Sequence, residues 1–345
     1  MTPIYNQLLI PFLTAMVVAI TMGGSGTAPA FSASYGANVM RKSLIPGLFG
    51  IMVFVGAFLA GKKTASTMGS GILPAEYMDF TVVSIALFSI AVTMLISNIS
   101  GIPQSTSQAA VLALAAPALY FGRLDTHNLF IEIIPAWFIL PIISYFLSFF
   151  AGKYIYQPMR RRGLTIQRAQ NENKRHIWDI VLVIMALYVS FAIGSNNVAN
   201  AAGPLYTMTI NELHIRESDH IVILMLATLV VAPCFGIGAS LFGHKILKNT
   251  GKEIILFGKF EAVIIAFISG SLLLLASVVK GIPTSLVQVN VAAILGIGVA
   301  KMGHKNIFRK TQVKRFFTMW MIAPVISFLL SLLLIFLADK ANLLQ

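Results

Sequence analysis

Residues 101–108 read Gly101-Ile102-Pro103-Gln104-Ser105-Thr106-Ser107-Gln108, and 180 positions later the chain reads Gly281-Ile282-Pro283-Thr284-Ser285-Leu286-Val287-Gln288. A second pattern, Trp137-x-Ile139-x-Pro141-x-Ile143-Ser144, returns after 183 residues as Trp320-x-Ile322-x-Pro324-x-Ile326-Ser327. Because the two offsets nearly agree, the chain consists of two long halves in register. Both octapeptides place proline and hydroxyl groups inside an apolar stretch. Duplicated interruptions of this kind indicate the substrate site of a secondary transporter.

The composition is that of a membrane protein. Of the 345 residues, 57% are hydrophobic and 11% are charged, and the mean hydropathy is +0.83. A soluble domain carries about 25% charged residues. The net charge of +13 could indicate a nucleic-acid partner, but the basic residues lie in short stretches between apolar segments. We interpret them as orientation signals and as contacts for anionic lipid, so we expect the lipid bilayer, and no nucleic acid, as a partner.

Apolar stretches long enough to span a bilayer recur along the whole chain. They predict an all-α, polytopic fold with spans at about 4–22, 45–61, 80–97, 129–150, 177–195, 221–243, 260–278 and 316–338. Four segments between them are interrupted by small or polar residues. Two are rich in Gly, Ser and Asn and are predicted to break their helices, 23–40 and 194–210. Two begin with Gly-Ile-Pro and either cross the membrane or re-enter it as hairpins, 101–121 and 281–300.

The number of crossings predicts that the halves are inverted repeats. If each Gly-Ile-Pro segment crosses once in net terms, each half crosses five times, and the second half must begin on the opposite side. The predicted division is a first repeat at 1–155, a basic cytoplasmic connector at 156–176 and a second repeat at 177–345. A cytoplasmic connector puts 19 of the 25 Lys and Arg residues inside, in 41–44, 151–176, 244–259 and 301–315. This bias predicts both termini outside a plasma (inner) membrane.

The strongest single motif is the Asn-rich segment Gly194-Ser195-Asn196-Asn197-Val198-Ala199-Asn200. Three amides within five residues are costly against lipid, where unpaired polar groups find no water. Their partners could be neighbouring helices, an ion or a substrate. The matching stretch, Gly23-Gly24-Ser25-Gly26-Thr27-Ala28-Pro29, has no carboxylate, and a break there would expose N–H groups that bind anions. The candidate substrate ligands here are Asn196, Asn197, Asn200, Ser25 and Thr27.

The residues after the two prolines stand where helices are expected to begin, because proline suits the first helical turn. Taken singly, Ser and Thr at such positions are ordinary N-caps. Two inverted copies at membrane depth would instead bring two positive helix ends towards one centre. That arrangement suits a doubly charged oxyanion. The candidate ligands are Ser105, Thr106, Ser107 and Gln108 in the first copy and Thr284, Ser285 and Gln288 in the second.

Acidic residues in the spans are few, which makes each one a candidate for carrying the coupling ion. Asp79 and Glu261 lie 182 residues apart, at the start of equivalent helices. A salt bridge, such as Glu261 with Lys259, is the competing interpretation. Glu261 ranks first because it lies further into its apolar run.

Several other classes of function find no support. No Walker motif is present, so ATP-driven transport by this chain alone is not expected. No His/Cys cluster predicts a metal site, and no nucleophile–base pair predicts catalytic residues or a cofactor. Cys234 is the single cysteine and cannot form a disulfide within the chain. We therefore expect a transporter rather than an enzyme.

At these motifs the chain resembles the inorganic phosphate transporter (PiT) family. That family carries two inverted copies of the signature Gly-Ala-Asn-Asp-x-Ala-Asn-Ala. Residues 194–201 match the second copy, with Asn197 where the family has Asp, and Ser25, Gly26 and Pro29 depart from the first. Residues 101–108 are similar to the family's Gly-x-Pro-x-Ser-Thr-Thr-His segment, with Gln108 at the His position. The departures resemble the sulfate-permease (CysP-type) branch of the family.

This resemblance implies an inverted-repeat fold, a homodimer, and import of an oxyanion driven by a cation gradient. It assigns anion binding to the Ser/Thr residues of the two octapeptides. It associates sodium with the signature positions, where Gly26 and Asn197 have replaced both carboxylates. Their loss favours protons over sodium as the coupling ion.

Elementary chemistry also favours sulfate as the substrate. Sulfate carries no proton near neutral pH and offers only acceptors, so a carboxylate beside it would be repulsive. Phosphate keeps at least one proton, which a site that only donates hydrogen bonds leaves unpaired. A phosphate importer is the first alternative, and an uncoupled anion channel or exporter is the second. A membrane scaffold or receptor has no need of duplicated polar breaks.

Overall fold

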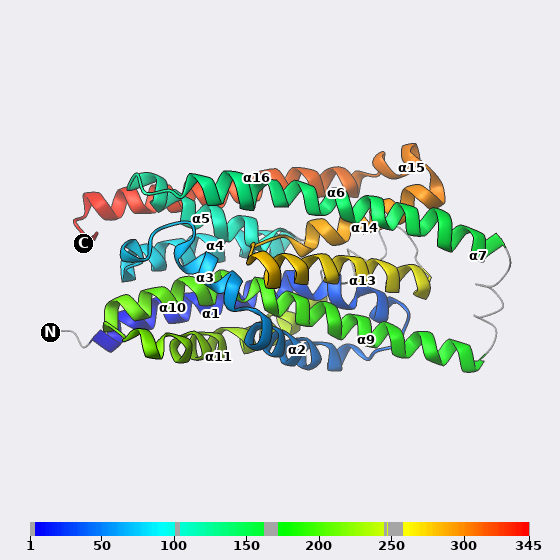
Figure 1. Cartoon of the computed structure of the whole chain (residues 1–345), viewed down its shortest axis with the longest axis horizontal. Coiled ribbons are helices and arrows are strands. Elements are labelled where there is room, and N and C mark those ends of the chain that lie inside the picture. Colours follow the sequence, from blue (N-terminus) through cyan, green and yellow to red (C-terminus); the bar gives the residue numbers. More distant parts are fainter. Residues whose placement is uncertain (1–3, 101–103, 162–171, 245–246, 248–257, 345) are drawn as a thin grey trace.

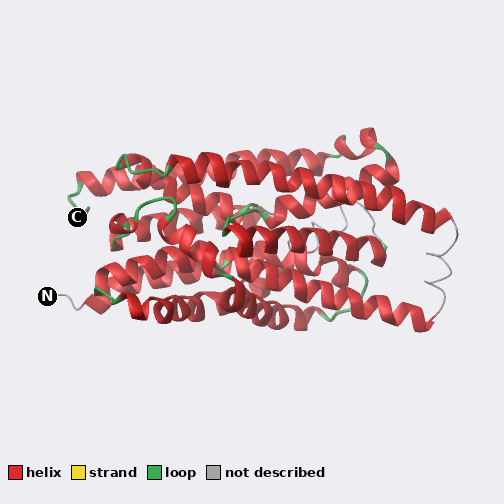
Figure 2. Ribbon diagram, in the orientation of Figure 1, coloured by secondary structure: helices red, strands yellow, loops and turns green. Residues whose placement is uncertain are grey.

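The computed structural model describes residues 4–100, 104–161, 172–244, 247 and 258–344, and the regular structure of these residues is entirely helical (Figure 2). The helices of the first half are α1 (Ile4–Gly36), α2 (Ile45–Ala60), α3 (Lys62–Ser70), α4 (Phe80–Ser100), α5 (Thr106–Tyr120), α6 (Ile134–Phe150) and α7 (Gln157–Arg161). Those of the second half are α9 (Glu172–Asn197), α10 (Ala199–Leu213), α11 (His220–Gly238), α13 (Lys259–Leu275), α14 (Leu286–Met302), α15 (His304–Phe308) and α16 (Thr311–Lys340). Short π-helical turns extend α6, α11 and α13.

The predicted membrane-spanning character is confirmed. Eight helical stretches within the described residues are long and apolar enough to cross a membrane. The helices run along the long axis of the molecule, with the start of α1 and the end of α16 at one end (Figure 1). At the other end lie α7 and the start of α9. Residues 101–103 and the central part of the predicted connector, 162–171, lie outside the described residues.

The predicted helix break at 23–40 is wrong. Helix α1 continues through the glycine-rich stretch to Gly36. The hydroxyls that would have served a break instead bond back into the same helix, from Ser25 Oγ to the Met22 carbonyl at 3.0 Å and from Thr27 Oγ1 to the Gly23 carbonyl at 2.7 Å. The break predicted at 194–210 shrinks to a single residue, Val198, between α9 and α10.

The glycines allow close helix packing rather than a break. A Cβ at Gly194 would lie 2.0 Å from the Val53 carbonyl oxygen, where α9 crosses α2. A Cβ at Gly238 would lie 1.8 Å from the Ile20 carbonyl oxygen, where α11 crosses α1. Real Cβ atoms do not approach this closely, so only glycine permits these two crossings.

The two halves interlock through their last helices. Helix α6 of the first half packs on α14 of the second, and α16 packs on α5. Ser144 Oγ donates to the Val289 carbonyl at 2.8 Å, and Ser327 Oγ donates to the Ala109 carbonyl at 2.9 Å. The second contact repeats the first at the offsets found in the sequence, so the duplicated residues make matching contacts in exchanged halves.

Candidate functional site

The two duplicated octapeptides start two short helices, α5 with 15 residues and α14 with 17. Ser105 and Ser285 are their N-caps, with extended backbones and side chains that accept from the backbone N–H groups of Gln108 and Gln288, each at 3.2 Å. The N-cap interpretation of these two serines is therefore confirmed. An α-helix leaves its first N–H groups without intrahelical acceptors.

The two helix starts meet at a pair of glutamines. Gln108 Nε2 donates to Gln288 Oε1 at 3.1 Å, and Gln288 Nε2 donates to Gln108 Oε1 at 2.9 Å. Both side chains are buried. From this meeting point α5 extends towards the end of the molecule that holds the termini, and α14 extends towards the other end (Figure 1). Two positive helix ends thus face one another inside the protein.

The turn that leads into α14 is held from three directions. Gly281 adopts a left-handed φ of 67° after α13 and its π-helical extension, and the Ile282 N–H bonds back to the Ala276 carbonyl at 3.0 Å. Trp137 Nε1 donates to the Pro283 carbonyl at 3.0 Å. Lys63 Nζ donates to the Val279 carbonyl at 3.1 Å. This turn therefore presents Thr284 and Ser285 in a defined place.

Asn196 is the centre of the hydrogen-bond network. Its Oδ1 accepts from the Thr284 N–H at 3.1 Å and from Ser107 Oγ at 3.3 Å. Its Nδ2 donates to Ser277 Oγ at 2.8 Å and to the Ile282 carbonyl at 3.0 Å. One fully buried amide thus joins α9 to the start of α5 and to the turn before α14.

The other two amides of the Asn-rich segment lie beside this network. Asn200 Nδ2 donates to Ser107 Oγ at 3.1 Å. Both Asn197 and Asn200 are buried, and their Oδ1 atoms have no hydrogen-bond partner among the described residues. Thr106 is buried in the first turn of α5. The structure therefore brings together the Asn-rich segment and both octapeptides, as the sequence predicts.

Two further buried side chains are left without partners at equivalent positions of the two octapeptides. Gln104 directly precedes the cap of α5, and neither its Nε2 nor its Oε1 makes a hydrogen bond within the described part of the chain. Thr284 directly precedes the cap of α14, and its Oγ1 likewise makes no hydrogen bond among the described residues. The exposed fractions of these residues are 0% and 1%. Buried polar atoms without a partner are rare and mark places where a ligand, an ion or water binds. Gln104 is not among the site residues that the motifs predict, although its place between a proline and a capping serine is a signal for one.

Ser25 and Thr27 do not contribute as predicted. Both hydroxyls bond within α1, and without a helix break there are no freed N–H groups at these positions. A polar side chain from α4 reaches α1 near this point. Asn98 Nδ2 donates to the Thr21 carbonyl at 2.7 Å, and Asn98 Oδ1 is buried without a partner in the described part of the chain.

Asp79 lies directly before the first residue of α4, and the whole length of α4 separates it in sequence from the start of α5. Its Oδ1 accepts from the Val82 N–H at 2.7 Å, while Glu212 Oε1 accepts from the Phe80 N–H at 2.9 Å. Burial raises the pKa of the Asp79 carboxyl, and the negative charge of Glu212 raises it further. The hydrogen bond from the Val82 N–H partly opposes this rise in pKa.

Glu261 lies in the first turn of α13. It is fully buried and pairs with Lys301 at 3.1 Å, whereas Lys259 pairs with Asp179. The salt-bridge interpretation of Glu261 is therefore confirmed, but its partner is Lys301 rather than Lys259. Sixteen residues of helix separate Glu261 from Ser277 at the network, about 24 Å at the rise of an α-helix. Neither carboxylate contacts the residues around Asn196.

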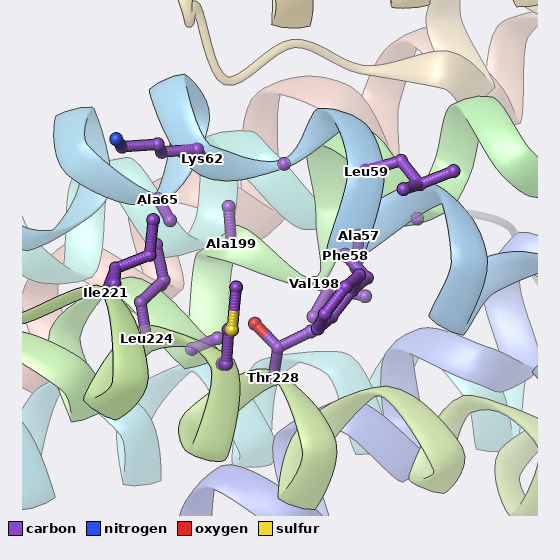
Figure 3. A pocket seen from close by; sticks show the side chains of 14 residues that line it. Ala57, Phe58, Leu59, Lys62, Ala65, Val198, Ala199, Ile221, Leu224 and Thr228 are labelled. Carbon is purple, nitrogen blue, oxygen red and sulfur yellow. The ribbon is translucent and has the colours of Figure 1, made fainter.

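A cavity of about 150 Å³ adjoins the Asn-rich segment between α2, α3, α9, α10 and α11 (Figure 3). It is lined mainly by apolar side chains such as Phe58, Leu224 and Met225. Its lining also includes one charged residue, Lys62, and one residue with a hydroxyl group, Thr228. Because carbon dominates its lining, the cavity lacks the density of donors found at the two helix starts.

Comparison with known proteins places these features in context. A sequence profile described as the phosphate transporter family matches residues 22–331. The sulfate permease CysP of Bacillus subtilis (strain 168) is 31% identical over 337 residues, covering 97% of this chain and 89% of that protein. A solved structure described as "The sodium-dependent phosphate transporter" superposes with a TM-score of 0.83 at 19% identity, covering 97% of this chain and 99% of the other.

Proposed function

The chain belongs to the phosphate transporter family, and we propose that within this family it is a secondary active importer of sulfate, driven by a cation gradient. One observation carries the proposal. Two capped helix starts face each other across Gln108 and Gln288, surrounded by hydroxyls and amides, and no described carboxylate contacts them. Neutral donors and helix dipoles are the groups that suit a doubly charged anion without a proton.

The proposed anion ligands come from both halves. The first-turn N–H groups of Thr106 and Ser107 in α5, and of Leu286 and Val287 in α14, have no acceptor within their helices. The hydroxyl of Thr284 and the second N–H of each paired glutamine amide add donors at the same place. The matched contacts of the two halves support the inverted-repeat organisation, with the helix hairpins α4–α5 and α13–α14 entering from opposite sides.

Phosphate is the alternative substrate. The matching family and the superposed structure are both named for phosphate. The similarity to a sulfate permease and the absence of a carboxylate from the described centre favour sulfate. A carboxylate would accept the proton of hydrogenphosphate and repel sulfate, whereas neutral amides and hydroxyls do not repel a doubly charged anion.

Proton coupling remains the first proposal for the driving cation, with Asp79 and Glu261 as carriers at the two ends of the path. Sodium is the second candidate, and a specific observation favours it. The carbonyl oxygens of Asn197, Asn200 and Gln104 are buried acceptors without donors among the described residues, and a hard cation is bound by such oxygens. The structural neighbour is described as sodium-dependent. If sodium binds here, Asn197→Asp should tighten its binding and extend uptake to phosphate.

The cellular setting completes the proposal. The clustering of basic residues supports an orientation with α7 and the start of α9 in the cytoplasm and both termini outside a plasma (inner) membrane. A homodimer is proposed from the family resemblance alone. An uncoupled channel or exporter is the remaining alternative, and it differs from a symporter by its failure to accumulate the anion against a gradient.

The test is uptake of labelled sulfate into proteoliposomes under an imposed pH gradient or sodium gradient, with excess unlabelled phosphate as competitor. Proton-driven accumulation that is indifferent to phosphate is the expected result. Sodium-driven accumulation indifferent to phosphate would keep the substrate and replace the coupling ion. Uptake that phosphate blocks would overturn the choice of sulfate, and equilibration without accumulation would overturn symport.

A further inference from the structure

Gln104 is the most completely unpaired side chain in the described centre. It is 0% exposed, and neither its amide nitrogen nor its carbonyl oxygen has a partner there. We infer that the Gln104 side-chain amide is a further anion-binding group that contributes to substrate specificity. This inference rests on the proposed function and deepens it, because the ligand is the same tetrahedral oxyanion.

The energetics of burial support a ligand at this position. A buried amide that makes no hydrogen bond destabilises the protein, whereas an apolar side chain of the same size carries no such cost. Three other side chains at this place have protein partners, because Gln108 and Gln288 bond to each other and Asn196 bonds to the turn before α14. Within the described residues, Gln104 has no protein partner that a ligand would first have to displace.

The position of Gln104 supports the same ligand. It directly precedes Ser105, the cap of α5, so it stands at a helix start whose N–H groups at Thr106 and Ser107 are available. The equivalent residue in the second octapeptide is Thr284, whose backbone is fixed by Asn196 and whose hydroxyl is also unpaired among the described residues. Equivalent positions before the two caps thus each offer an unused donor.

The chemistry of the amide explains specificity. Nε2 carries two N–H donors, and a fully deprotonated oxyanion offers only acceptors. The carbonyl oxygen Oε1 needs a donor or a cation of its own, which a hydration water or the coupling cation supplies. A carboxylate at this place would repel sulfate and would accept the proton of hydrogenphosphate.

The experiment compares Gln104→Leu and Gln104→Met with Ser148→Ala. Ser148 is a matched control because its hydroxyl is also buried and unpaired in the described chain but lies on α6, eleven residues beyond Trp137. Thermal unfolding of the purified protein is measured with and without sulfate, and sulfate uptake is measured in proteoliposomes. All three variants should unfold at or above the wild-type temperature without sulfate. Only the Gln104 variants should lose most of the sulfate-induced shift, with KM raised about 10- to 100-fold.

A charged variant adds a readout that a structural role would not change. Gln104→Glu should lower the ratio of sulfate to phosphate uptake, because it exchanges a donor for a charged acceptor. The inference would be overturned if the Gln104 variants that fold kept the wild-type KM for sulfate and the wild-type ratio of sulfate to phosphate uptake. Two neutral variants are used because Met preserves the side-chain length if Leu disturbs folding. A wild-type protein that neither transports sulfate nor gains thermal stability from it would instead overturn the proposed function.

Discussion

Replacing Asn196 by alanine tests the hydrogen-bond network directly. The substitution removes four contacts, but their loss is not equally costly. Ser107 Oγ still accepts from Asn200, and Ser277 Oγ still donates to the Leu273 carbonyl at 2.9 Å. The groups that lose their partner are the Thr284 N–H and the Ile282 carbonyl, both in the turn before α14.

The magnitude follows from these two backbone groups. The Thr284 N–H is buried, whereas the Ile282 carbonyl is only part-buried. A buried group left without its partner costs about 1–3 kcal/mol, so the two together predict a loss of about 3 kcal/mol in the free energy of unfolding, most of it from Thr284. The turn they leave unsupported carries the start of α14. We therefore expect weaker binding of sulfate as well, with KM raised at least about tenfold.

The assay is reversible unfolding in mixed micelles, combined with sulfate uptake. Asn290→Ala is the matched control, because Asn290 is a buried amide on α14 whose Nδ2 makes one long bond of 3.4 Å, to Ser269 Oγ. This control should cost less than about 1 kcal/mol and leave KM unchanged. If Asn196→Ala unfolds like the control, the network does not hold the turn, and the reasoning from buried backbone groups is refuted.

Three further predictions concern helix packing, the Lys301–Glu261 ion pair and pH. Gly194→Ala should displace α9 from α2 and reduce both stability and uptake, whereas Gly47→Ala, where a Cβ meets nothing within 4 Å, should have no such effect in the same unfolding assay. Lys301→Met should lower the free energy of unfolding by about 3–5 kcal/mol, because it leaves the buried Glu261 carboxylate without its cation. Adding Glu261→Gln should recover most of this loss. A double-mutant cycle that shows no coupling energy between the two residues would contradict the pairing. Burial raises the folded-state pKa of Asp79, so its contribution to stability is present below the unfolded pKa and lost as pH rises through the folded pKa. Asp79→Asn should remove that loss in melting temperatures measured across the acidic range, and if Asp79 carries the coupling proton, the variant should also abolish the pH dependence of uptake.

The sequence by itself determined the membrane class, the eight spans and the two octapeptides and Asn-rich segment that meet at the centre, although it wrongly added Ser25 and Thr27 and missed Gln104. Hydropathy over about 20 residues is a local property, and so is the sequence of proline followed by a capping serine that begins α5 and α14. The duplicated register also placed Gln108 and Gln288 in equivalent positions 180 residues apart, and they are hydrogen-bonded to each other.

Only the tertiary structure decided whether a glycine-rich stretch breaks its helix. By sequence alone, Gly23 and Gly194 could each mark a hinge. In the structure, Gly23 packs against the backbone of Phe235 and Gly194 packs against the backbone of Val53, both on crossing helices. The partners of Glu261 and the unpaired amide of Gln104 were equally hidden from the sequence. A local sequence pattern shows which donors and acceptors a segment carries. Their hydrogen-bond partners come from helices that are distant in the sequence. The packing of those helices therefore determines which polar atoms are paired and which remain available to a ligand.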